Sequence, residues 1–393
     1  MCQCQYVSGV REMTGGLYLM CIVSPGVSAE IIDLQESYKK RLSDLKNVTN
    51  QERREIVKEF SLEFFELACQ RIEATGMDLV ADQSWCCKCN DWCNVCPPTG
   101  PGTMWLEIAG NTCTPWSQAG LQLGWLDRQS VAALCWGFFL LKHKPDFIVN
   151  ECTRRFDAQG FFARVLGAGH KVTSVVVSPS DMGIPSRRHR RYTIATKCSR
   201  IFPAFDFGDI FPHVASRSIM MRPDVFFCAP EDAQQTCLAE LLRRRGLVAP
   251  RQSWQATWKL ALSFSDRQRL REYIKKYKEG LPGCLCDVSQ NYKWIRSLSQ
   301  LCFPTLVTNS IIYNLMSERL LVAPEYFAVN GVPVFAGYDD GDEVMLLPES
   351  TFSSFSFKTS RRLSGNMMSI PVVGSVIGTM LLCSNLRATG ASQ

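Results

Sequence analysis

Between residues 49 and 76, apolar residues recur every three or four positions among charged ones. This spacing is typical of an amphipathic helix with one apolar face. Thr49 and Glu52 form a Thr-x-x-Glu capping box where the pattern begins, and Gly76 follows where it ends. We therefore predict a helix over this stretch.

Short apolar runs alternate with helical patterns between residues 104 and 198. The predicted strands are 104–109, 146–151, 171–178 and 191–197, and the predicted helices are 127–143 and 157–169. This alternation predicts an α/β fold with a largely parallel sheet and helices on both faces. Ligands gather at the carboxyl ends of the strands in such sheets, and Cys113 and Glu151 both fall at such ends.

The alternation is lost from about residue 200 to residue 318, where only 265–280 has a clear helical pattern. We predict a second domain there. The apolar stretch 369–383 contains serine, proline and glycine and is shorter than the roughly 20 residues that cross a bilayer. It predicts a buried helix that returns to the first domain, and no membrane partner.

The chain has 393 residues, of which 46% are apolar and 20% charged, so it can bury a large core. No secretory leader pattern opens it, and several of its 19 cysteines lie in apolar runs, which favours a reduced, intracellular setting. The net charge of +6 is mild, but arginines cluster in 187–191, 241–246 and 360–362. These clusters fit a polyanionic partner or solvated surfaces.

Five cysteines lie within residues 86–96, and four of them form two CxxC pairs, Cys86 with Cys89 and Cys93 with Cys96. Only three residues separate the pairs, fewer than in the usual zinc ribbon or finger. We predict no metal, and a zinc-binding regulatory module built on this cluster stays an alternative.

The run "GNTCTPWSQAG" (110–120) resembles the nucleophile loop of the C5-cytosine DNA methyltransferases, Gly-x-Pro-Cys-Gln-x-Phe-Ser. Cys113 matches the cysteine, while Thr112 replaces the proline and Trp116 the phenylalanine. On spacing alone, Cys113 could equally be a small buried hydrophobic residue.

Four further segments follow in the family's order. "VNECTRRF" is similar to the Glu-Asn-Val segment, with Glu151 in place and Cys152 for the asparagine. "DMGIPSRRHRRYTIA" resembles Gly-x-Pro-Gln-x-Arg-x-Arg, with Arg188 and Arg190 as the two arginines and Ser186 for the glutamine. Residues 319–333 and 363–378 resemble the segment that supports target recognition and the closing Gly-Asn helix.

The resemblance implies a DNA cytosine-5 methyltransferase that uses S-adenosylmethionine on double-stranded DNA, and the DNA substrate implies the nucleus. It implies a Rossmann-like sheet and a smaller target-recognition domain. The implied domains are catalytic (1–199, with a divergent donor-binding part at 1–103), target recognition (200–318) and a return to the catalytic domain (319–393).

The resemblance also assigns roles to residues. A cysteine with a lowered pKa, here Cys113, adds to C6 of the base, and Glu151 assists at N3. Arg188 and Arg190 brace the loop or contact the base or phosphate. The base must leave the stack for this chemistry, so the second domain contacts the grooves.

The match is poorest where the methyl donor should bind. The family begins with Phe-x-Gly-x-Gly-Gly, whereas five residues here separate Gly9 from Gly15 and Gly16. The resemblance assigns the donor to Gly15, Gly16, Glu30 (ribose), Asp78 (adenine) and Asn366 of the closing helix. A catalytically inactive DNA-binding relative and an RNA cytosine methyltransferase stay as alternatives.

Overall fold

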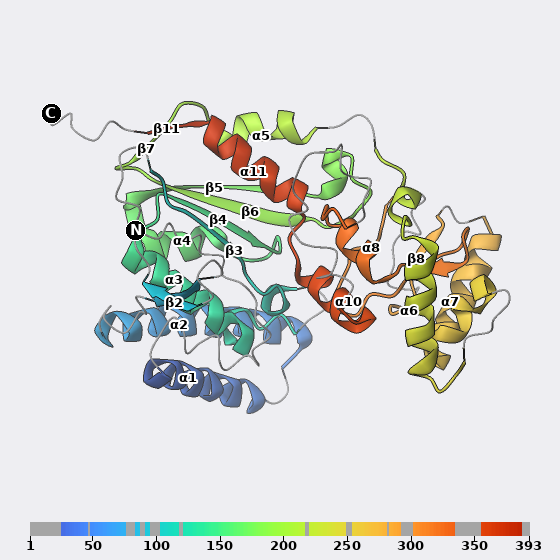
Figure 1. The fold of residues 1–393 in the computed structure, drawn as a ribbon. Coiled ribbons are helices and arrows are strands. Elements are labelled where there is room, and N and C mark those ends of the chain that lie inside the picture. Colours follow the sequence, from blue (N-terminus) through green and yellow to red (C-terminus); the bar gives the residue numbers. More distant parts are fainter. Residues whose placement is uncertain are drawn as a thin grey trace. The chain divides into compact units, whose positions relative to one another are not determined.

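The computed structural model describes residues 25–45, 48–75, 83–86, 91–94, 103–117, 121–216, 220–248, 254–280, 283–291, 302–334 and 355–386 (Figure 1). The chain forms two compact units. Unit 1 comprises Met1–Val176, Arg190–Ile210 and Thr379–Gln393, and unit 2 comprises Val177–His189 and Phe211–Gly378. Each unit is described by itself.

The four-stranded sheet of unit 1 has the order β3-β4-β6-β5. Its strands are β3 (Leu106–Gly110), β4 (Phe147–Cys152), β5 (His170–Val177) and β6 (Arg190–Lys197). Strands β3 and β4 are parallel, and β6 is antiparallel to β4. The α/β prediction is confirmed, but the sheet is mixed rather than largely parallel. Residues 178–189, which join β5 to β6, contain one short 3-10 turn and no crossover helix.

Helices α3 (Val131–His143) and α4 (Ala158–Leu166) follow β3 and β4, as predicted. The Asp157 side chain caps α4 by accepting from the Gly160 amide at 3.0 Å. The core of unit 1 joins these helices to one face of the sheet. Its members include Trp125, Leu134, Phe138, Ile148, Phe161, Phe162 and Ala195.

Two amino-terminal helices, α1 (Pro25–Ser43) and α2 (Asn50–Thr75), pack against one another and against the 3-10 turn η4 (Gly124–Leu126; Figure 1). Helix α2 is the predicted one, and its capping box is made: the Glu52 carboxylate accepts from the Thr49 amide at 2.8 Å, and the Thr49 hydroxyl accepts from the Glu52 amide at 3.2 Å. Helix α1 was not predicted. We call the two helices the amino-terminal hairpin.

Hydrogen bonds and one stacked ring pair join this hairpin to Trp125. Phe65 of α2 stacks on the indole with 4.5 Å between centroids. Gln35 of α1, which is fully buried, donates to the Trp125 carbonyl at 2.8 Å, and the Ser61 hydroxyl accepts from the Trp125 amide at 2.8 Å. Gly124 has a φ of 58°, and a Cβ there would lie 2.5 Å from the Ser61 hydroxyl, so this approach requires glycine.

Two carboxylates of α2 also bind Arg164 of α4. The guanidinium lies 2.9 Å from Glu66 and 2.6 Å from Glu73. These hydrogen bonds to Arg164 are the main reason that the pKa values of Glu66 and Glu73 are lowered.

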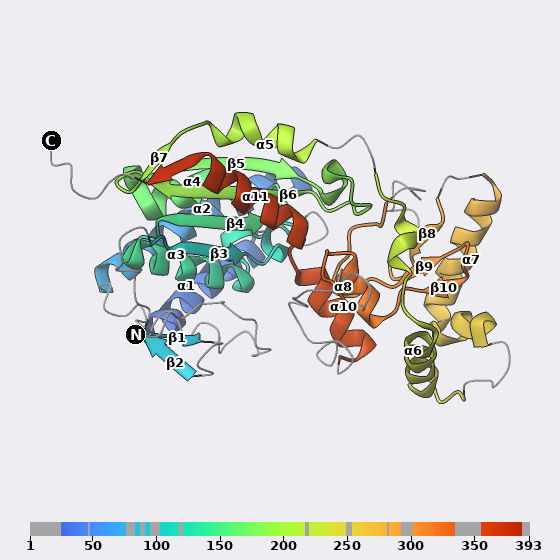
Figure 2. The same cartoon turned by 45° about the horizontal axis from the view of Figure 1, so that its top comes forward.

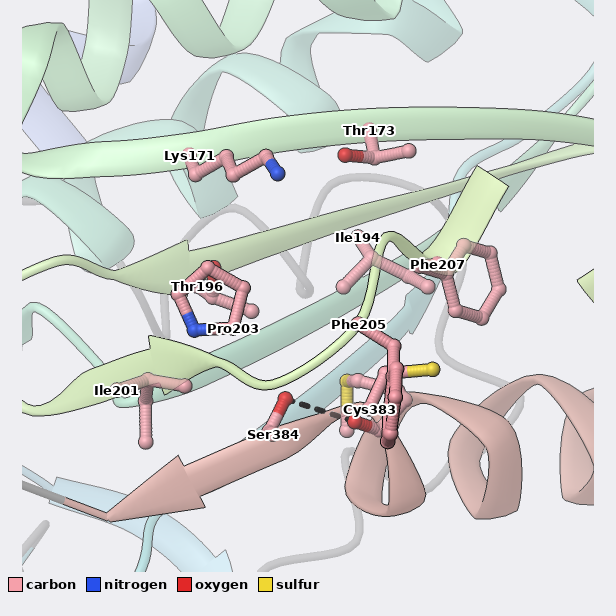
Figure 3. Close-up of a pocket in the computed structure, with 11 residues that line it drawn as sticks. Lys171, Thr173, Ile194, Thr196, Ile201, Pro203, Phe205, Phe207, Cys383 and Ser384 are labelled. Atoms are coloured by element: carbon pink, nitrogen blue, oxygen red, sulfur yellow. Dashed lines mark hydrogen bonds between the residues drawn. The ribbon is translucent and has the colours of Figure 1, made fainter. Parts of the chain in front are cut away.

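At the other end of unit 1, β7 (Ile201–Pro203) pairs antiparallel with β11 (Ser384–Leu386). Figure 3 shows a pocket, partly open to solvent, between β5, β6, β7 and the residues around Cys383. Lys171, on its wall, lies 3.2 Å from Asp206. Helix α5 (Phe207–Ala215) follows β7.

Helix α11 (Ile370–Leu382) covers most of the stretch predicted as a buried helix. One side is buried, at Val372, Val376 and Met380, whereas Leu382 is 77% exposed, so the helix is only half buried. By length and composition alone, Phe357–Leu382 could cross a membrane, a test that core helices of soluble proteins also pass. The absence of a membrane partner stays a prediction.

Unit 2 combines helices with a small antiparallel sheet of order β10-β9-β8. The strands are β8 (Leu285–Asp287), β9 (Ile312–Asn314) and β10 (Arg319–Leu320); the helices are α6 (Glu231–Arg243), α7 (Phe264–Lys278), α8 (Ala323–Ala328) and α10 (Phe357–Asn366). Short 3-10 turns lie at Pro179–Met182, Pro223–Phe226 and Trp254–Ala261. The core is rich in large rings and includes Trp258, Tyr273, Tyr313, Tyr326 and Phe357.

The two compact units divide the chain differently from the predicted domains. The chain rejoins unit 1 at Thr379 rather than at residue 319. The reason is packing, because Leu320, Tyr326 and Phe357 belong to the core of unit 2. The recognition role of residues 200–318 stays a prediction.

Candidate active site

Cys113 lies in a turn that directly follows β3. It precedes the 3-10 turn η3 (Thr114–Trp116), and its carbonyl accepts from the Trp116 amide at 3.1 Å. The Trp116 ring anchors the turn by meeting Phe156 edge-on, with 4.7 Å between centroids. Trp116 is buried, whereas Cys113 is partly exposed.

Glu151 lies on the neighbouring strand at the same level. Gly110, the last residue of β3, is in register with Glu151, and the Asn111 amide donates to the Glu151 carbonyl at 3.0 Å. The carboxylate is buried, and its Oε1 lies 3.0 Å from Nε of Arg190, the first residue of β6. Three adjacent strands therefore bring Cys113, Glu151 and Arg190 to one end of the sheet.

The neighbouring thiol of Cys152 is suited to packing rather than catalysis. It is buried, and its Sγ lies 3.8 Å from the Asn111 carbonyl. Burial first, and then the Glu151 carboxylate, raise the pKa of Cys152 far above the usual range of a thiol. Burial likewise raises the pKa of Cys135 to about 12. Among the cysteines whose side chains the structure describes, only Cys113, Cys198 and Cys228 are not buried.

The two predicted arginines lie in different units. Arg188 is buried in unit 2, where its Nη1 donates to the carbonyls of Leu306 and Gly365, each at 3.1 Å. Its own amide donates to the Ser178 hydroxyl at 3.1 Å. Arg188 thus joins segments of unit 2, while Arg190 pairs with Glu151 in unit 1.

The structure adds two polar residues that the sequence reasoning did not single out. Asn150 is buried in β4, and its Nδ2 donates to the Ala109 carbonyl at 3.2 Å. Its Oδ1 and the Nδ2 of Asn111 are buried without a hydrogen-bond partner within the described ranges. Most buried polar groups in proteins have a hydrogen-bond partner, which can be an ordered water. An asparagine inside the apolar run "FIVNEC" is the signal that could have identified this position.

Two of the residues predicted to hold the methyl donor are described, Glu30 in unit 1 and Asn366 in unit 2. Glu30 lies on α1 with half its side chain exposed and is 3.6 Å from Arg71 of α2. Asn366 is exposed at the end of α10. Gly15, Gly16 and Asp78 lie outside the described residues. Neither Glu30 nor Asn366 lines the pocket of Figure 3.

The cysteine cluster is described only in part. Strands β1 (Gln83–Cys86) and β2 (Asp91–Asn94) pair antiparallel, with Cys93 opposite Ser84. Cys87, Cys89 and Cys96 lie outside the described residues. In the part of the chain that the structure describes, no group of three or more His, Cys, Asp or Glu could hold a metal ion. The zinc alternative therefore stays open.

No model of a known protein family matches the chain. The Type II methyltransferase M.NlaX of Neisseria lactamica is 32% identical over 93 residues, which cover 22% of this chain. The match spans only 30% of the length of that relative.

Two solved structures resemble the chain more weakly. The S. pombe Dnmt2 methyltransferase is 16% identical, with a TM-score of 0.39, over 70% of this chain and 77% of that chain. The Entamoeba histolytica methyltransferase EhMeth is 13% identical, with a TM-score of 0.38, over 70% of this chain and 76% of that chain. Likenesses this distant decide nothing about activity. The partial sequence match, however, confirms that the chain resembles the DNA methyltransferases, as its motifs predict.

Proposed function

We propose that the chain acts on cytosine in double-stranded DNA as a C5-cytosine methyltransferase that forms a covalent adduct through Cys113. One observation carries the proposal: an accessible thiol and a buried carboxylate, paired with Arg190, lie at the ends of adjacent strands. This is the end of an α/β sheet where ligands bind. The sequence resemblance supports the same two residues.

The proposed adduct follows from the chemistry of the base. The Cys113 thiolate forms a bond to C6, the C5–C6 double bond is lost, and N3 gains a proton. Glu151 supplies that proton or a hydrogen bond at N3, and Arg190 orients its carboxyl group. The adduct is an enamine, so C5 can now attack an electrophile. Loss of the C5 hydrogen and expulsion of the thiolate then restore the aromatic ring.

A stacked base cannot reach a thiol at the edge of a folded domain. The target cytosine must therefore rotate out of the duplex, at a cost of a few kcal/mol. We assign the DNA contacts that compensate for this cost to unit 2, in keeping with the predicted recognition role of residues 200–318.

S-adenosylmethionine is the donor that the resemblance implies, and of the residues assigned to it the structure describes only Glu30 and Asn366, in different units. Glu30, the proposed ribose ligand, is on an exposed helical face and is paired with Arg71. We derive no methyl-transfer step for this reason. The test of Cys113 is accordingly chosen to need no donor.

The test is exchange of the C5 hydrogen of cytosine with solvent. Duplex DNA is incubated with the protein in D₂O, and deuterium at C5 is measured by mass spectrometry after digestion to nucleosides. We expect exchange with the unaltered protein, because the enamine takes a deuteron at C5 before the thiolate leaves. Cys113→Ala should abolish exchange, and Cys198→Ala, which removes an exposed thiol of the same unit, should not. Equal exchange with Cys113→Ala would refute the adduct.

A second candidate is a DNA-binding protein that transfers no methyl group, and the helical position of Glu30 favours it. Calorimetry with S-adenosylmethionine separates the two, with Cys113→Ala protein as a folding control. Micromolar binding by both proteins supports the enzyme, and the exchange assay on RNA of the same sequence then identifies the preferred substrate. Folded protein with neither donor binding nor exchange supports the binding protein.

A further inference from the structure

Helix α7 packs into unit 2 through one face. Leu270 and Tyr273 are buried in the core of the unit, and the Tyr273 hydroxyl donates to the Asp287 carbonyl of β8 at 3.3 Å. On the same side, the Arg269 guanidinium donates to the Val288 carbonyl at 2.6 Å. Figure 2 shows α7 lying beside β9 and β10. These contacts leave the opposite face of the helix to solvent.

The solvent face carries a row of four positive charges. Arg267, Arg271, Lys275 and Lys278 are spaced by four, four and three residues, so a helix of 3.6 residues per turn aligns them. At 1.5 Å per residue the row is about 17 Å long. We call these four residues the α7 row.

Within the described residues the α7 row is paired with few acidic side chains, and only Lys275 lies close enough to a carboxylate, that of Glu279, to lower its pKa. None of its four members forms a salt bridge there, whereas Arg269 and Lys276 pair with Asp266 and Glu279. The helix has six basic and two acidic residues. A row of like charges repels itself and is stabilised by a bound polyanion.

An aromatic ring lies in line with the row. Phe264, three residues before Arg267, opens α7 and is 74% exposed. It is among the most exposed large apolar side chains of the described residues. Aromatic rings beside a positively charged track are the usual platform for an unpaired base, because every base has a face that stacks.

We propose that α7 is a binding site for a single-stranded stretch of nucleic acid. The α7 row contacts successive phosphates, and Phe264 stacks on one base. The site rests on the proposed action on nucleic acid. A strand with a base displaced from its duplex presents both backbone phosphates and an unpaired base. The site does not depend on the chemistry of Cys113, because binding alone is its readout.

Salt dependence of binding tests the α7 row. A fluorescent 12-nucleotide single strand is titrated with the full chain at several salt concentrations. The logarithm of the binding constant falls linearly with the logarithm of the salt concentration, by about 0.7 per phosphate contact on a single strand. Replacing all four members of the row by glutamine should therefore make this slope about 3 less steep. The matched control replaces Lys40, Arg53, Arg54 and Lys58, four exposed cations of the amino-terminal hairpin, by glutamine. The control should keep its slope, and equal losses in both variants would refute the site.

Phe264→Leu tests the stacked base. It should weaken single-strand binding about tenfold, since stacking is worth roughly 5- to 150-fold per base, and leave duplex binding unchanged. An unchanged single-strand affinity, or an equal loss on duplex, would overturn the assignment to unpaired bases. DNA and RNA strands of one sequence, compared side by side, identify which sugar the site accepts. Cys113→Ala should bind all these ligands normally, so loss of exchange and loss of binding are separate results.

Discussion

Two buried arginine–glutamate pairs, one in each unit, share the same chemistry in different surroundings. In unit 2, the Nη1 and Nη2 atoms of Arg319 donate hydrogen bonds to the two carboxylate oxygens of Glu325, at 2.9 and 2.7 Å. The same carboxylate accepts hydrogen bonds from the backbone amides of Ala229 and Val322, at 2.8 and 2.9 Å. In unit 1, Arg190 approaches Glu151 at 3.0 Å through Nε.

The pairs differ in what lies around them. Glu325 is 0% exposed at the start of α8, where it holds that helix, the segment before α6 and β10 together. Glu151 lies at the end of a strand, next to the turn with the accessible thiol of Cys113. A buried ion pair is therefore no mark of function by itself, and its position in the fold decides how it is used.

Replacing Glu151 by glutamine gives the largest expected change in activity. The variant keeps the shape of the side chain but cannot supply a proton at N3. Exchange of the C5 hydrogen should fall by about 10²- to 10⁴-fold, the usual worth of a general acid. Glu107→Gln is the control, because Glu107 is a partly buried carboxyl of β3 that binds Trp136 instead. If Glu107→Gln lost as much exchange, Glu151 would have no special role.

Replacing Glu325 by glutamine tests the other pair, through stability. The change leaves the Arg319 charge buried without its partner, which typically costs about 3 to 5 kcal/mol. Urea unfolding measures this loss. Glu318→Gln breaks the exposed pair with Lys259 and should cost less than about 1 kcal/mol. Similar losses in the two variants would contradict the contrast between buried and exposed pairs.

The smallest effect is expected at Arg164, whose partners are half exposed. The pKa values of Glu66 and Glu73 are lowered in the folded chain, so their stabilising effect is present above the ordinary value of 4.5 and is lost as the pH falls through the lowered values. Arg164→Met should remove up to about 1 kcal/mol at pH 7 and weaken the loss of stability on acidification. Urea unfolding at pH 7 and pH 4 measures both, and an unchanged pH dependence would show that Arg164 is not the cause.

Local patterns predicted much of unit 1. The capping box of Thr49 and Glu52 predicted the start of α2. Short apolar runs predicted β3 to β6, because turn or helix signals bound each strand in the sequence. Cys113 and Glu151 could be expected near one another, since adjacent parallel strands end at one edge of a sheet. Their catalytic roles stay predictions.

The remaining features depend on contacts that no local pattern contains. Helix α1 has apolar residues at helical spacing, but its buried face includes the polar Gln35, which binds a carbonyl 90 residues away. Arg188 and Arg190 have the spacing of one strand face, but β6 begins only at Arg190, so Arg188 precedes the strand. The pairing of β7 with β11 joins residues far apart in the sequence.

The attachment of the amino-terminal hairpin to Trp125 has a thermodynamic consequence for the turn at Cys113. The Trp125 and Trp116 rings meet edge-on at 5.2 Å, so the hairpin, the loop at 124–126 and the nucleophile turn share one packed cluster. A ligand that binds only when this cluster opens must also loosen the hairpin. Coupling of this kind is reciprocal. A molecule that stabilises the packed hairpin lowers the affinity for that ligand, and the ligand lowers the affinity for that molecule by the same factor. For such a ligand the two helices are linked to the affinity of the site, although they contribute none of its predicted catalytic groups.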